Sequence, residues 1–492
     1  MSSFIEAFDA PDIFGPYFRG PSWDAWRAVL KAAHGVPLDD TELELFRSVA
    51  DRDPPKQRVK ELWVIAGRRS GKDSVASAMA TYAALQPYSG LRPGETPAIM
   101  CLANDRSQAK IVLRYIAGLF DAIDGLHGIV DRETPESLEL SNGVEIGVMT
   151  NSLRAVRGRT VAFVCLDEVA FYRSDDSANP DVETYNALKP GMATIPEAML
   201  VGISSPYRKS GLLYSKWKSH YGRDDDGVLV IRAASQVLNP TLDQAIVDEA
   251  MERDPAAARA EYFAEWRADI SGFIDAELIE GCIERDVDRR PPRHGETYRG
   301  FVDVSGGRSD SAVLTIGHRC RDRIILDVIV ERRAPYSPDS IAAEFAGTLK
   351  AYGLGTVTGD AYGAEWTTER FGAHGVIYQP SELNRSEIYL NFLPAVTSGQ
   401  VDLLDNRKMV AQFAQLERRT SRAGRDTIDH PSGGHDDVSN AVAGCITLLA
   451  VKKQFPAHAF TAEASQAFAA TMRQRFPDGP GSMPRPPVRM VF

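Results

Sequence analysis

Cysteine, long apolar runs and positive charge are all scarce in this sequence. Five cysteines are scattered over 492 residues without a C-x-x-C pair, a pattern typical neither of a disulfide framework nor of a zinc site. No apolar run reaches the roughly 18 residues of a membrane-spanning helix, and the first residues lack the basic and apolar regions of a signal peptide. We therefore expect a soluble, intracellular protein with no membrane partner.

Basic residues are outnumbered, with 56 Lys and Arg against 67 Asp and Glu and a net charge of −11. This balance excludes a histone-like polycation, so any contact with nucleic acid must come from local basic patches. The composition is otherwise that of a globular protein, 43% hydrophobic and 25% charged. A chain of this length allows two or three domains, each with its own core.

Within this ordinary composition, a strand, a glycine-containing loop and a helix follow one another directly. Residues 62–66 are an apolar run typical of a strand buried on both faces, and strong helix formers begin at Val75. The backbone N–H groups of such a loop, the helix N-terminus and a lysine together hold the phosphates of a nucleotide. The predicted phosphate-binding residues are Gly67, Arg68, Arg69, Ser70, Gly71, Lys72, Asp73 and Ser74.

The loop departs from the consensus G-x-x-x-x-G-K-[ST] at both ends. Ala66 stands at the first glycine position, and Asp73 stands where a magnesium-binding hydroxyl is expected. A carboxylate beside a triphosphate is repelled, so Asp73 must face the metal or turn away. Taken alone, the loop is equally compatible with a plain helix start whose arginines are solvated.

Two later strands end in residues suited to nucleotide hydrolysis. The apolar run 161–166 leads to Asp167 and Glu168, which would lie at the carboxyl edge of the sheet, where ligands bind in α/β folds. Asp167 can hold magnesium through water, and Glu168 can orient and deprotonate the attacking water. Another apolar run ends in Ser204 and Ser205, which could sense the γ-phosphate or simply form a Ser-Pro turn. Together with the loop, the acidic pair predicts an ATPase.

The second half of the chain has a different pattern. Three strand-like runs separated by short turns predict an antiparallel meander, and helices and strands alternate after it. The expected strands are 298–304, 311–317, 323–330, 355–360 and 375–379, with helices at 338–352 and at the end of the domain. This is the element order of a ribonuclease-H-like fold with a mixed sheet.

Four aspartates occupy the positions where such a fold needs acids: Asp303, Asp360, Asp436 and Asp437. The first and fourth strands are neighbours in that sheet and the last helix starts over their shared edge, so the carboxylates would converge on two metal ions about 4 Å apart. Hard oxygen ligands favour magnesium or manganese over zinc. Taken singly, an aspartate is more typical of a cap or turn, and Asp436 is a candidate helix N-cap. His435 could be a further metal ligand, a base beside the metal ligands, or a surface residue.

We therefore expect an α/β protein with two main domains, divided at the basic, turn-rich stretch 289–295. The predicted segments are an N-terminal helical lead-in (1–60), a phosphate-loop ATPase core with a mostly parallel sheet (61–235), a lid or linker subdomain (236–294), a ribonuclease-H-like nuclease domain with a mixed sheet (295–453) and a disordered proline-rich tail (454–492).

In the order and spacing of its motifs, the chain resembles the large terminase subunit of tailed bacteriophages, or the related protein of gene-transfer agents, over roughly residues 10–450. The shared segments are A-G-R-R-S-G-K-D, V-C-L-D-E, G-I-S-S-P, F-V-D-V-S-G-G, V-T-G-D and G-G-H-D-D-V-S-N-A. The resemblance implies an ATP-driven motor that pumps double-stranded DNA through a portal into a procapsid. It also implies an endonuclease that cuts the concatemer at the start and end of packaging.

The resemblance further implies roles for individual residues. Lys72 with Arg68 or Arg69 would grip the phosphates of ATP. The possible ligands of its Mg²⁺ are Ser70, Asp73 and Ser74. The remaining assignments are Asp167 as a metal ligand, Glu168 as the catalytic carboxylate, Ser204 and Ser205 in the coupling segment, and Asp303, Asp360 and Asp437, with Asp436, around two Mg²⁺ or Mn²⁺ ions.

Partners and location also follow from the resemblance alone. The implied partners are double-stranded DNA, the portal protein, a small terminase subunit that supplies site choice, and further copies of the chain in a ring, expected to be pentameric, on the procapsid. The implied location is the cytoplasm of the infected host cell, with transient binding to the procapsid portal and absence from the mature virion. An arginine finger would come from Arg154, Arg157, Arg159 or Arg208.

Two other hypotheses about function are compatible with some of these motifs. A helicase-nuclease of repair or restriction would use the same loop and acids, but the sequence offers no clear second helicase domain. A non-enzymatic protein that binds nucleotide and docks on a capsid or portal would explain Asp73, which is unfavourable beside a triphosphate. Normal ATP turnover would eliminate this last reading.

Overall fold

The computed structural model describes residues 3–88, 91–150, 158–174, 177–225, 227–304, 310–360, 364–420, 426–431 and 433–450. The chain divides into two compact units: the first ends at Ser271, and the second begins at Gly272 and also includes Asp175–Ala178. In the described part of the chain, no helix is long and apolar enough to cross a membrane. The predicted proline-rich tail, Arg154 and Arg157 lie outside the described residues.

In the described residues, the first unit is built on an eight-stranded sheet with the order β3-β4-β5-β2-β6-β7-β1-β8. Its strands are β1 (Glu61–Ala66), β2 (Pro97–Ala103), β3 (Val130–Glu133), β4 (Ser137–Leu140), β5 (Glu145–Thr150), β6 (Thr160–Asp167), β7 (Met199–Ser204) and β8 (Val228–Ala233). From β5 to β8 the neighbours run parallel, and β3 and β4 add an antiparallel edge. The mostly parallel sheet predicted for this half is confirmed.

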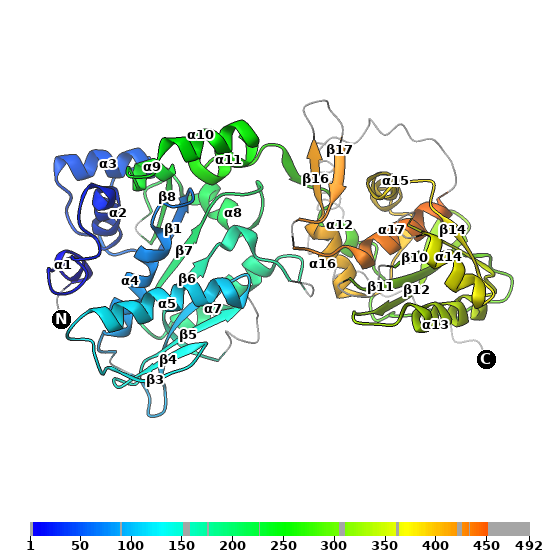
Figure 1. The fold of residues 1–492 in the computed structure, drawn as a ribbon, viewed down its shortest axis with the longest axis horizontal. Helices are drawn as coiled ribbons and strands as arrows, with labels where there is room; N and C mark the ends of the chain where they lie inside the picture. Colours follow the sequence, from blue (N-terminus) through cyan, green and yellow to red (C-terminus); the bar gives the residue numbers. More distant parts are fainter. Residues whose placement is uncertain are drawn as a thin grey trace, which may run out of the picture. The chain divides into compact units, whose positions relative to one another are not determined.

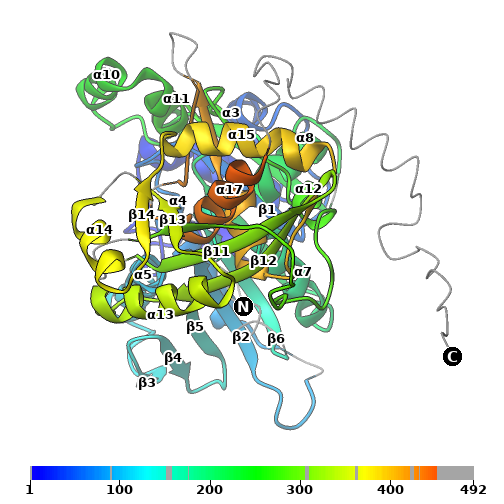
Figure 2. The same cartoon turned by 90° about the vertical axis from the view of Figure 1, so that its right-hand side faces the viewer.

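Helices cover both faces of this sheet (Figure 2). α4 (Lys72–Ala84) and α5 (Arg106–Ala122) pack together on one face, and α7 (Pro180–Met192) and α8 (Gly211–His220) pack together on the other. Because both faces are covered, β1, β2, β6 and β7 are buried along almost their whole length, which is why they are continuous apolar runs.

Shorter helices gather around β1 and β8, next to the loop that leaves β1. They are α1 (Phe4–Asp9), η1 (Pro21–Trp23), α2 (Asp24–Ala33), α3 (Asp40–Ala50), α9 (Ser235–Leu238), α10 (Gln244–Arg253) and α11 (Pro255–Phe263). α3 packs on β8, α11 on β1, and α2 on α9. The segments before and after the sheet in sequence therefore meet at the same end of β1.

In the second unit, the described strands form a six-stranded sheet with the order β14-β13-β10-β11-β12-β15. The strands are β10 (Tyr298–Asp303), β11 (Ala312–Cys320), β12 (Arg323–Arg332), β13 (Thr356–Gly359), β14 (Ile377–Pro380) and β15 (Val401–Asp402). β10, β11 and β12 form the antiparallel meander, and β13 lies parallel to β10. The predicted ribonuclease-H-like order and its mixed sheet are confirmed.

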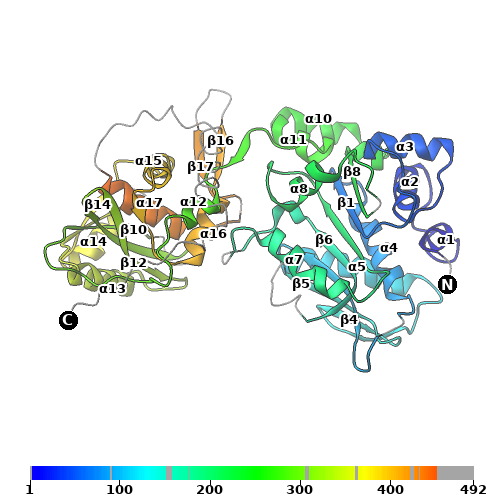
Figure 3. The ribbon, with the colours of Figure 1, turned by 180° about the vertical axis from the view of Figure 1, so that it is seen from behind.

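Two hydrophobic cores lie on opposite faces of this second sheet. α15 (Arg385–Thr397), α16 (Arg407–Gln415) and α17 (Asp437–Leu449) cover one face, and α13 (Pro338–Ala351) with α14 (Ala364–Ala373) covers the other (Figures 1 and 3). A Cβ added to Gly444 would lie 2.6 Å from the ring of Phe301, so a glycine is needed for α17 to lie this close to β10. That close approach fixes the start of α17 over the end of β10.

The boundary between the units differs from the predicted one. Residues 272–294, which the sequence assigned to the lid, belong to the second unit. Phe273, Ile274 and Ile279 are buried in its core, and α12 (Ala276–Glu280) packs on α16. The remaining described elements are η2 (Val169–Phe171), β9 (Ile270–Gly272), β16 (Glu417–Thr420) and β17 (Asp426–Asp429).

Candidate functional site

Side chains from other segments hold the loop between β1 and α4 by donating hydrogen bonds to its carbonyl groups. Trp26 Nε1 donates to the carbonyl of Ser70 at 2.7 Å, Ser235 Oγ to that of Arg68 at 2.7 Å, and Asn239 Nδ2 to that of Arg69 at 2.8 Å. In a trans peptide, the C=O of one residue and the N–H of the next point in opposite directions. The following N–H groups, those of residues 69–71, therefore point away from these anchors, as a phosphate cradle requires.

Close packing explains the glycine at position 67. A Cβ on Gly67 would lie 2.2 Å from Ser235 Oγ and 2.8 Å from the carbonyl oxygen of Glu261, so no larger residue fits while Ser235 anchors the loop. Arg69 and Gly71 have φ of 62° and 85°, which gives the loop its tight curvature. The first glycine of this loop therefore serves contact with α9 and α11 rather than ligand approach alone.

Lys72 and Glu168 meet across the sheet edge. Lys72 Nζ lies 3.0 Å from Glu168 Oε1, while Glu168 Oε2 accepts from Ser204 Oγ at 3.1 Å and from the backbone N–H of Ser205 at 3.3 Å. Burial alone would lower the pKa of Lys72, but the charges of Glu168, Asp73 and Asp167 raise it above its usual value. Because β7 lies between β1 and β6, these predicted residues come together at one edge.

Asp73 in the first turn of α4 and Asp167 at the end of β6 lie close enough for their charges to interact. Burial raises the pKa of both carboxyls, and the charge of Asp73 raises that of Asp167 further. In the described part of the chain, Oδ1 of each is buried without a hydrogen-bond partner, as are the hydroxyls of Ser70 and Ser205. Unpaired carboxylate oxygens beside a phosphate cradle fit the ligand set of Mg²⁺. Of the possible magnesium ligands Ser70, Asp73 and Ser74, Asp73 is the carboxylate, and its charge acts on Asp167.

The predicted arginines differ in their surroundings. Arg68 is 61% exposed and pairs with Glu261 at 2.9 Å, so its side chain is engaged by α11. Arg69 lies near enough to Asp73 for its charge to act against the rise in that carboxyl's pKa. Among the finger candidates, Arg159 pairs with Glu145 at 2.9 Å and Arg208 follows β7 in a partly exposed position. Arg68 is thus paired with α11, whereas Arg69 lies close to Asp73 at the start of α4.

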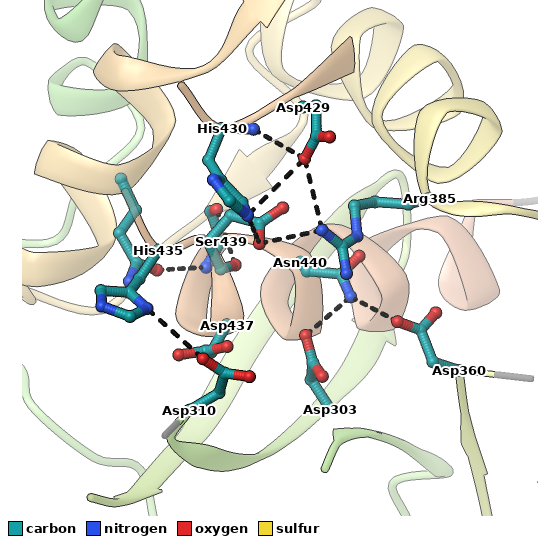
Figure 4. Close-up of polar contacts among 12 residues, drawn as sticks. Asp303, Asp310, Asp360, Arg385, Asp429, His430, His435, Asp437, Ser439 and Asn440 are labelled. Atoms are coloured by element: carbon teal, nitrogen blue, oxygen red, sulfur yellow. Dashed lines mark hydrogen bonds and ion pairs between the residues drawn. The ribbon is translucent and has the colours of Figure 1, made fainter. Parts of the chain in front are cut away.

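In the second unit, Asp303 and Asp360 come together through one amide group (Figure 4). Asp303 ends β10 and Asp360 directly follows β13. Asn440 Nδ2 donates to Asp303 Oδ2 at 2.7 Å and to Asp360 Oδ2 at 3.0 Å. The two predicted carboxylates therefore share an edge of the sheet, as the parallel pairing of β10 and β13 requires.

Asp437, the first residue of α17, joins this pair. Its Oδ2 accepts from the N–H of Ser311 at 3.2 Å. Burial raises the pKa of Asp437 to about 6. Burial also raises the pKa of Asp303 well above its usual value, and the charges of Asp360 and Asp437 raise it further. The charges of Asp360 and Asp437 thus both act against ionisation of Asp303, and a cation would relieve this repulsion.

Asp436 is directed to a different set of partners. Its Oδ1 lies 3.3 Å from Arg385, and its Oδ2 accepts from the hydroxyl of Tyr389 at 3.0 Å. It occupies the predicted N-cap position of α17, but its side chain makes no cap hydrogen bond. Asp436 therefore forms an ion pair with α15, while its charge also acts on Asp303 in the predicted carboxylate group. His435 is 45% exposed and lies 3.7 Å from Asp310.

Across the described ranges, no three histidine, cysteine, aspartate or glutamate side chains are arranged to hold a metal ion by themselves. Asp303 and Asp360, which share one donor, would need water or substrate oxygens to complete the coordination of a cation. Mg²⁺ commonly binds through one or two carboxylates with water and phosphate oxygens as the other ligands. The residues present therefore fit a cation that is held jointly with a phosphodiester.

Several residues of these sites were missed in the sequence. Asn440 follows Asp437 by three positions in a helix, a spacing that places both on one face. The sequence could therefore have indicated Asn440 as a residue of the site. Ser235, Asn239 and Arg385 lie far from the motifs they contact, and no local pattern marks them.

Solved structures with similarity to the chain include three bacteriophage terminase structures. The HK97 bacteriophage large terminase has 15% sequence identity and a TM-score of 0.38, covering 86% of this chain and 99% of that chain. The large terminase from the thermophilic bacteriophage D6E has 10% identity and a TM-score of 0.39, covering 88% and 99%. The large terminase nuclease from thermophilic phage G20c with bound magnesium has 16% identity and a TM-score of 0.31, covering 35% and 95%. No protein-family model and no curated protein matches the sequence.

Proposed function

We propose that this chain is the large subunit of a viral DNA-packaging terminase. Its first unit hydrolyses ATP to move double-stranded DNA, and its second unit is an endonuclease that depends on divalent cations. The observation that supports this most directly is the presence of two acidic sites in one chain. One is built around Lys72 and Glu168, and the other around Asp303 and Asp360.

In the first unit, the loop and Lys72 would hold the phosphates of ATP. The β- and γ-phosphates carry more negative charge than one carboxylate, so they would draw Lys72 away from Glu168. Glu168 would remain held by Ser204 and the N–H of Ser205. It could then accept a proton from the attacking water. Because Ser204 ends β7 and Ser205 directly follows it, loss of the γ-phosphate would be transmitted directly to that strand.

Asp73 and Asp167 would hold the Mg²⁺ of ATP, which neutralises phosphate charge when bound. This assigns to Asp73 the role of the missing hydroxyl residue and supplies a reason for its unpaired, buried oxygen. The variant Asp73→Ser restores the consensus residue. We expect it to bind ADP better than the wild type in EDTA, because a repulsive charge is gone, and to gain less affinity from Mg²⁺. Equal gains from Mg²⁺ in both proteins would contradict the role of Asp73.

In the second unit, Asp303, Asp360 and Asp437 would hold two Mg²⁺ or Mn²⁺ ions together with water and phosphate oxygens. Such ions activate water and stabilise the leaving oxygen of a phosphodiester when bound. The chain's own contribution is to fix these carboxylates at one sheet edge. Asp303 ends β10, Asp360 follows β13, and the backbone N–H of Ser311 orients Asp437. Two of these ligands come from the sheet and one from α17, so the site depends on the packing of that helix.

Partners and location belong to the same proposal. The motor would act on the portal of a procapsid as a ring of copies, expected to be five, with a small terminase subunit choosing the packaging site. It would work in the cytoplasm of the infected host cell and be absent from the mature virion. The net charge of −11 means that contact with double-stranded DNA would be confined to local basic regions.

The test separates the two sites by mutation. We expect Lys72→Ala and Glu168→Ala to abolish ATP turnover while plasmid cleavage with Mn²⁺ continues. Asp303→Ala should abolish cleavage while ATP turnover continues. Loss of both activities from one substitution in a folded protein would contradict the two-site proposal.

Two further assays address the rival functions. A strand-displacement assay on naked DNA tests for a helicase-nuclease, which would unwind DNA without a procapsid. Steady ATP turnover excludes a scaffold that only binds nucleotide.

A further inference from the structure

Asn440 is a neutral residue at the centre of the acidic site in the second unit. It is fully buried, and its Nδ2 group contacts the carboxylates of residues 137 and 80 positions away in sequence, Asp303 and Asp360. In the described part of the chain, its Oδ1 is buried without a hydrogen-bond partner. Figure 4 shows the amide of Asn440 directed between these two carboxylates.

The position of this amide is fixed by the helix that carries it. α17 lies tightly on β10 because Gly444, one turn after Asn440, leaves no gap above Phe301. The backbone N–H of Asn440 donates to the carbonyl of Asp436 at 2.7 Å, and the preceding residues Val438 and Ser439 donate their N–H groups to the side-chain oxygen of Gln412 at 2.8 and 3.0 Å. Asn440 therefore has little freedom to leave the carboxylates.

The chemistry of an amide suits this place. Its two N–H groups can serve two acceptors at once, and it carries no charge that would cancel the carboxylates. The two bonds take one oxygen from each of Asp303 and Asp360, so the other oxygen of each carboxylate is not used by this amide. The charges of Asp303 and Asp360 also raise the pKa of the nearby Arg385, whereas Asn440 orients the two carboxylates by hydrogen bonds alone.

We propose that Asn440 is the positioning residue of the nuclease centre, which holds the carboxylates of Asp303 and Asp360 at the separation that lets both bind one divalent cation. This inference rests on the proposed nuclease function. Partners that orient metal ligands typically change metal affinity by about 10- to 100-fold when they are removed. We therefore expect removal of the Asn440 amide to lower the affinity for the divalent cation rather than to disrupt the fold.

The experiment compares plasmid cleavage without ATP by the full chain at increasing Mn²⁺ concentration. We expect Asn440→Ala to raise the Mn²⁺ concentration for half-maximal cleavage by about 10- to 100-fold, with most of the maximal rate retained at saturating Mn²⁺. Asn391→Ala is the matched control, because Asn391 is exposed and its side chain donates to a carbonyl of its own helix, that of Glu387, at 2.7 Å. This control should leave the Mn²⁺ dependence unchanged.

Calorimetric titration with Mn²⁺ alone gives a second readout. Subtracting the signal of Asp303→Ala from that of the wild type isolates binding at the second unit, and this difference should weaken by the same factor in Asn440→Ala. If Asn440→Ala is too unstable to assay, Asn440→Ser takes its place in the same titration. The single O–H of serine can serve only one of the two carboxylates. This variant should show an intermediate loss of Mn²⁺ affinity.

The outcomes distinguish failure of the positioning role of Asn440 from failure of the nuclease function. An unchanged Mn²⁺ requirement in a folded Asn440→Ala or Asn440→Ser variant overturns the positioning role and leaves the nuclease intact. A fall in maximal rate at every Mn²⁺ concentration, with the same half-saturation, also overturns it. Failure of the wild type to cleave DNA in Mn²⁺ would instead remove the proposed nuclease function on which this inference rests.

Discussion

The buried carboxylate of Glu61 should make the first unit sensitive to acid. Glu61 begins β1, the strand whose other end carries the phosphate loop, and it is only 4% exposed. It pairs with Lys189 at 2.9 Å and Lys216 at 2.7 Å, and it accepts from Tyr185 at 2.7 Å. Trp63 Nε1 donates to it at 3.0 Å. We therefore expect Glu61→Gln to destabilise this unit.

The magnitude follows from the pKa of Glu61. Burial alone would raise this pKa, but hydrogen bonds from Lys216, Lys189 and Tyr185 lower it from 4.5 to about 2. At about 1.4 kcal/mol for each pH unit, this difference corresponds to about 3 kcal/mol of unfolding free energy. Because the folded pKa lies below the unfolded one, the contribution is fully present above pH 4.5 and is lost as the pH falls towards 2.

The assay is urea unfolding followed by tryptophan fluorescence, which reports chiefly on the first unit because five of the six tryptophans belong to it. Glu61→Gln should unfold about 3 kcal/mol more easily than the wild type at pH 7, and this gap should narrow to about 2 kcal/mol at pH 3.5. Glu145→Gln is the control, because its pair with Arg159 is one-third exposed on each side and should contribute at most about 1 kcal/mol. A gap that stays constant with pH would refute the electrostatic reasoning.

Three further predictions concern the sites themselves. Gly67→Ala should weaken ADP binding and cost about 1–3 kcal/mol of stability through its clash with Ser235, whereas Gly118→Ala, with open space around its position, should not. Asp436→Asn should lower the melting temperature while preserving the Mn²⁺ requirement for cleavage, and Asp437→Asn should raise that requirement. Because the pKa of Asp437 is about 6, Mn²⁺ affinity should rise with pH below 6 and level off above it; a flat profile from pH 5 to 7 would count against this site.

The parts of the fold that the sequence predicts are those set by local pattern. β1, β2 and β6 are buried on both faces, so their apolar runs mark them almost to the residue. The order of elements in the second half then places β13 beside β10, and with it Asp360 beside Asp303. In the first half, the loop and the acidic strand locate Lys72 and Glu168, because both stand directly at element ends.

What the sequence does not predict depends on contacts between distant segments. Nothing in the local pattern links Ser235 to the carbonyl of Arg68, 167 positions away. The domain boundary was misplaced because Phe273 and Ile274 enter the second core without any change in composition at that point. The ion pair between Asp436 and Arg385 could not be predicted either. Successive helix residues point about 100° apart, so the position of α15 decides which aspartate meets Arg385.

The carboxylates of the two sites differ in whether a neutral or a cationic side chain holds them. Asp303 and Asp360 are held by the neutral amide of Asn440, which orients them without cancelling their charge. Asp436 is held by the guanidinium of Arg385, although its charge still contributes to the raised pKa of Asp303. Glu168 has both kinds of partner, the neutral donors of β7 and the cationic Lys72. Lys72 is also the group that phosphates would attract, so nucleotide binding itself would convert Glu168 from a paired carboxylate into a free base.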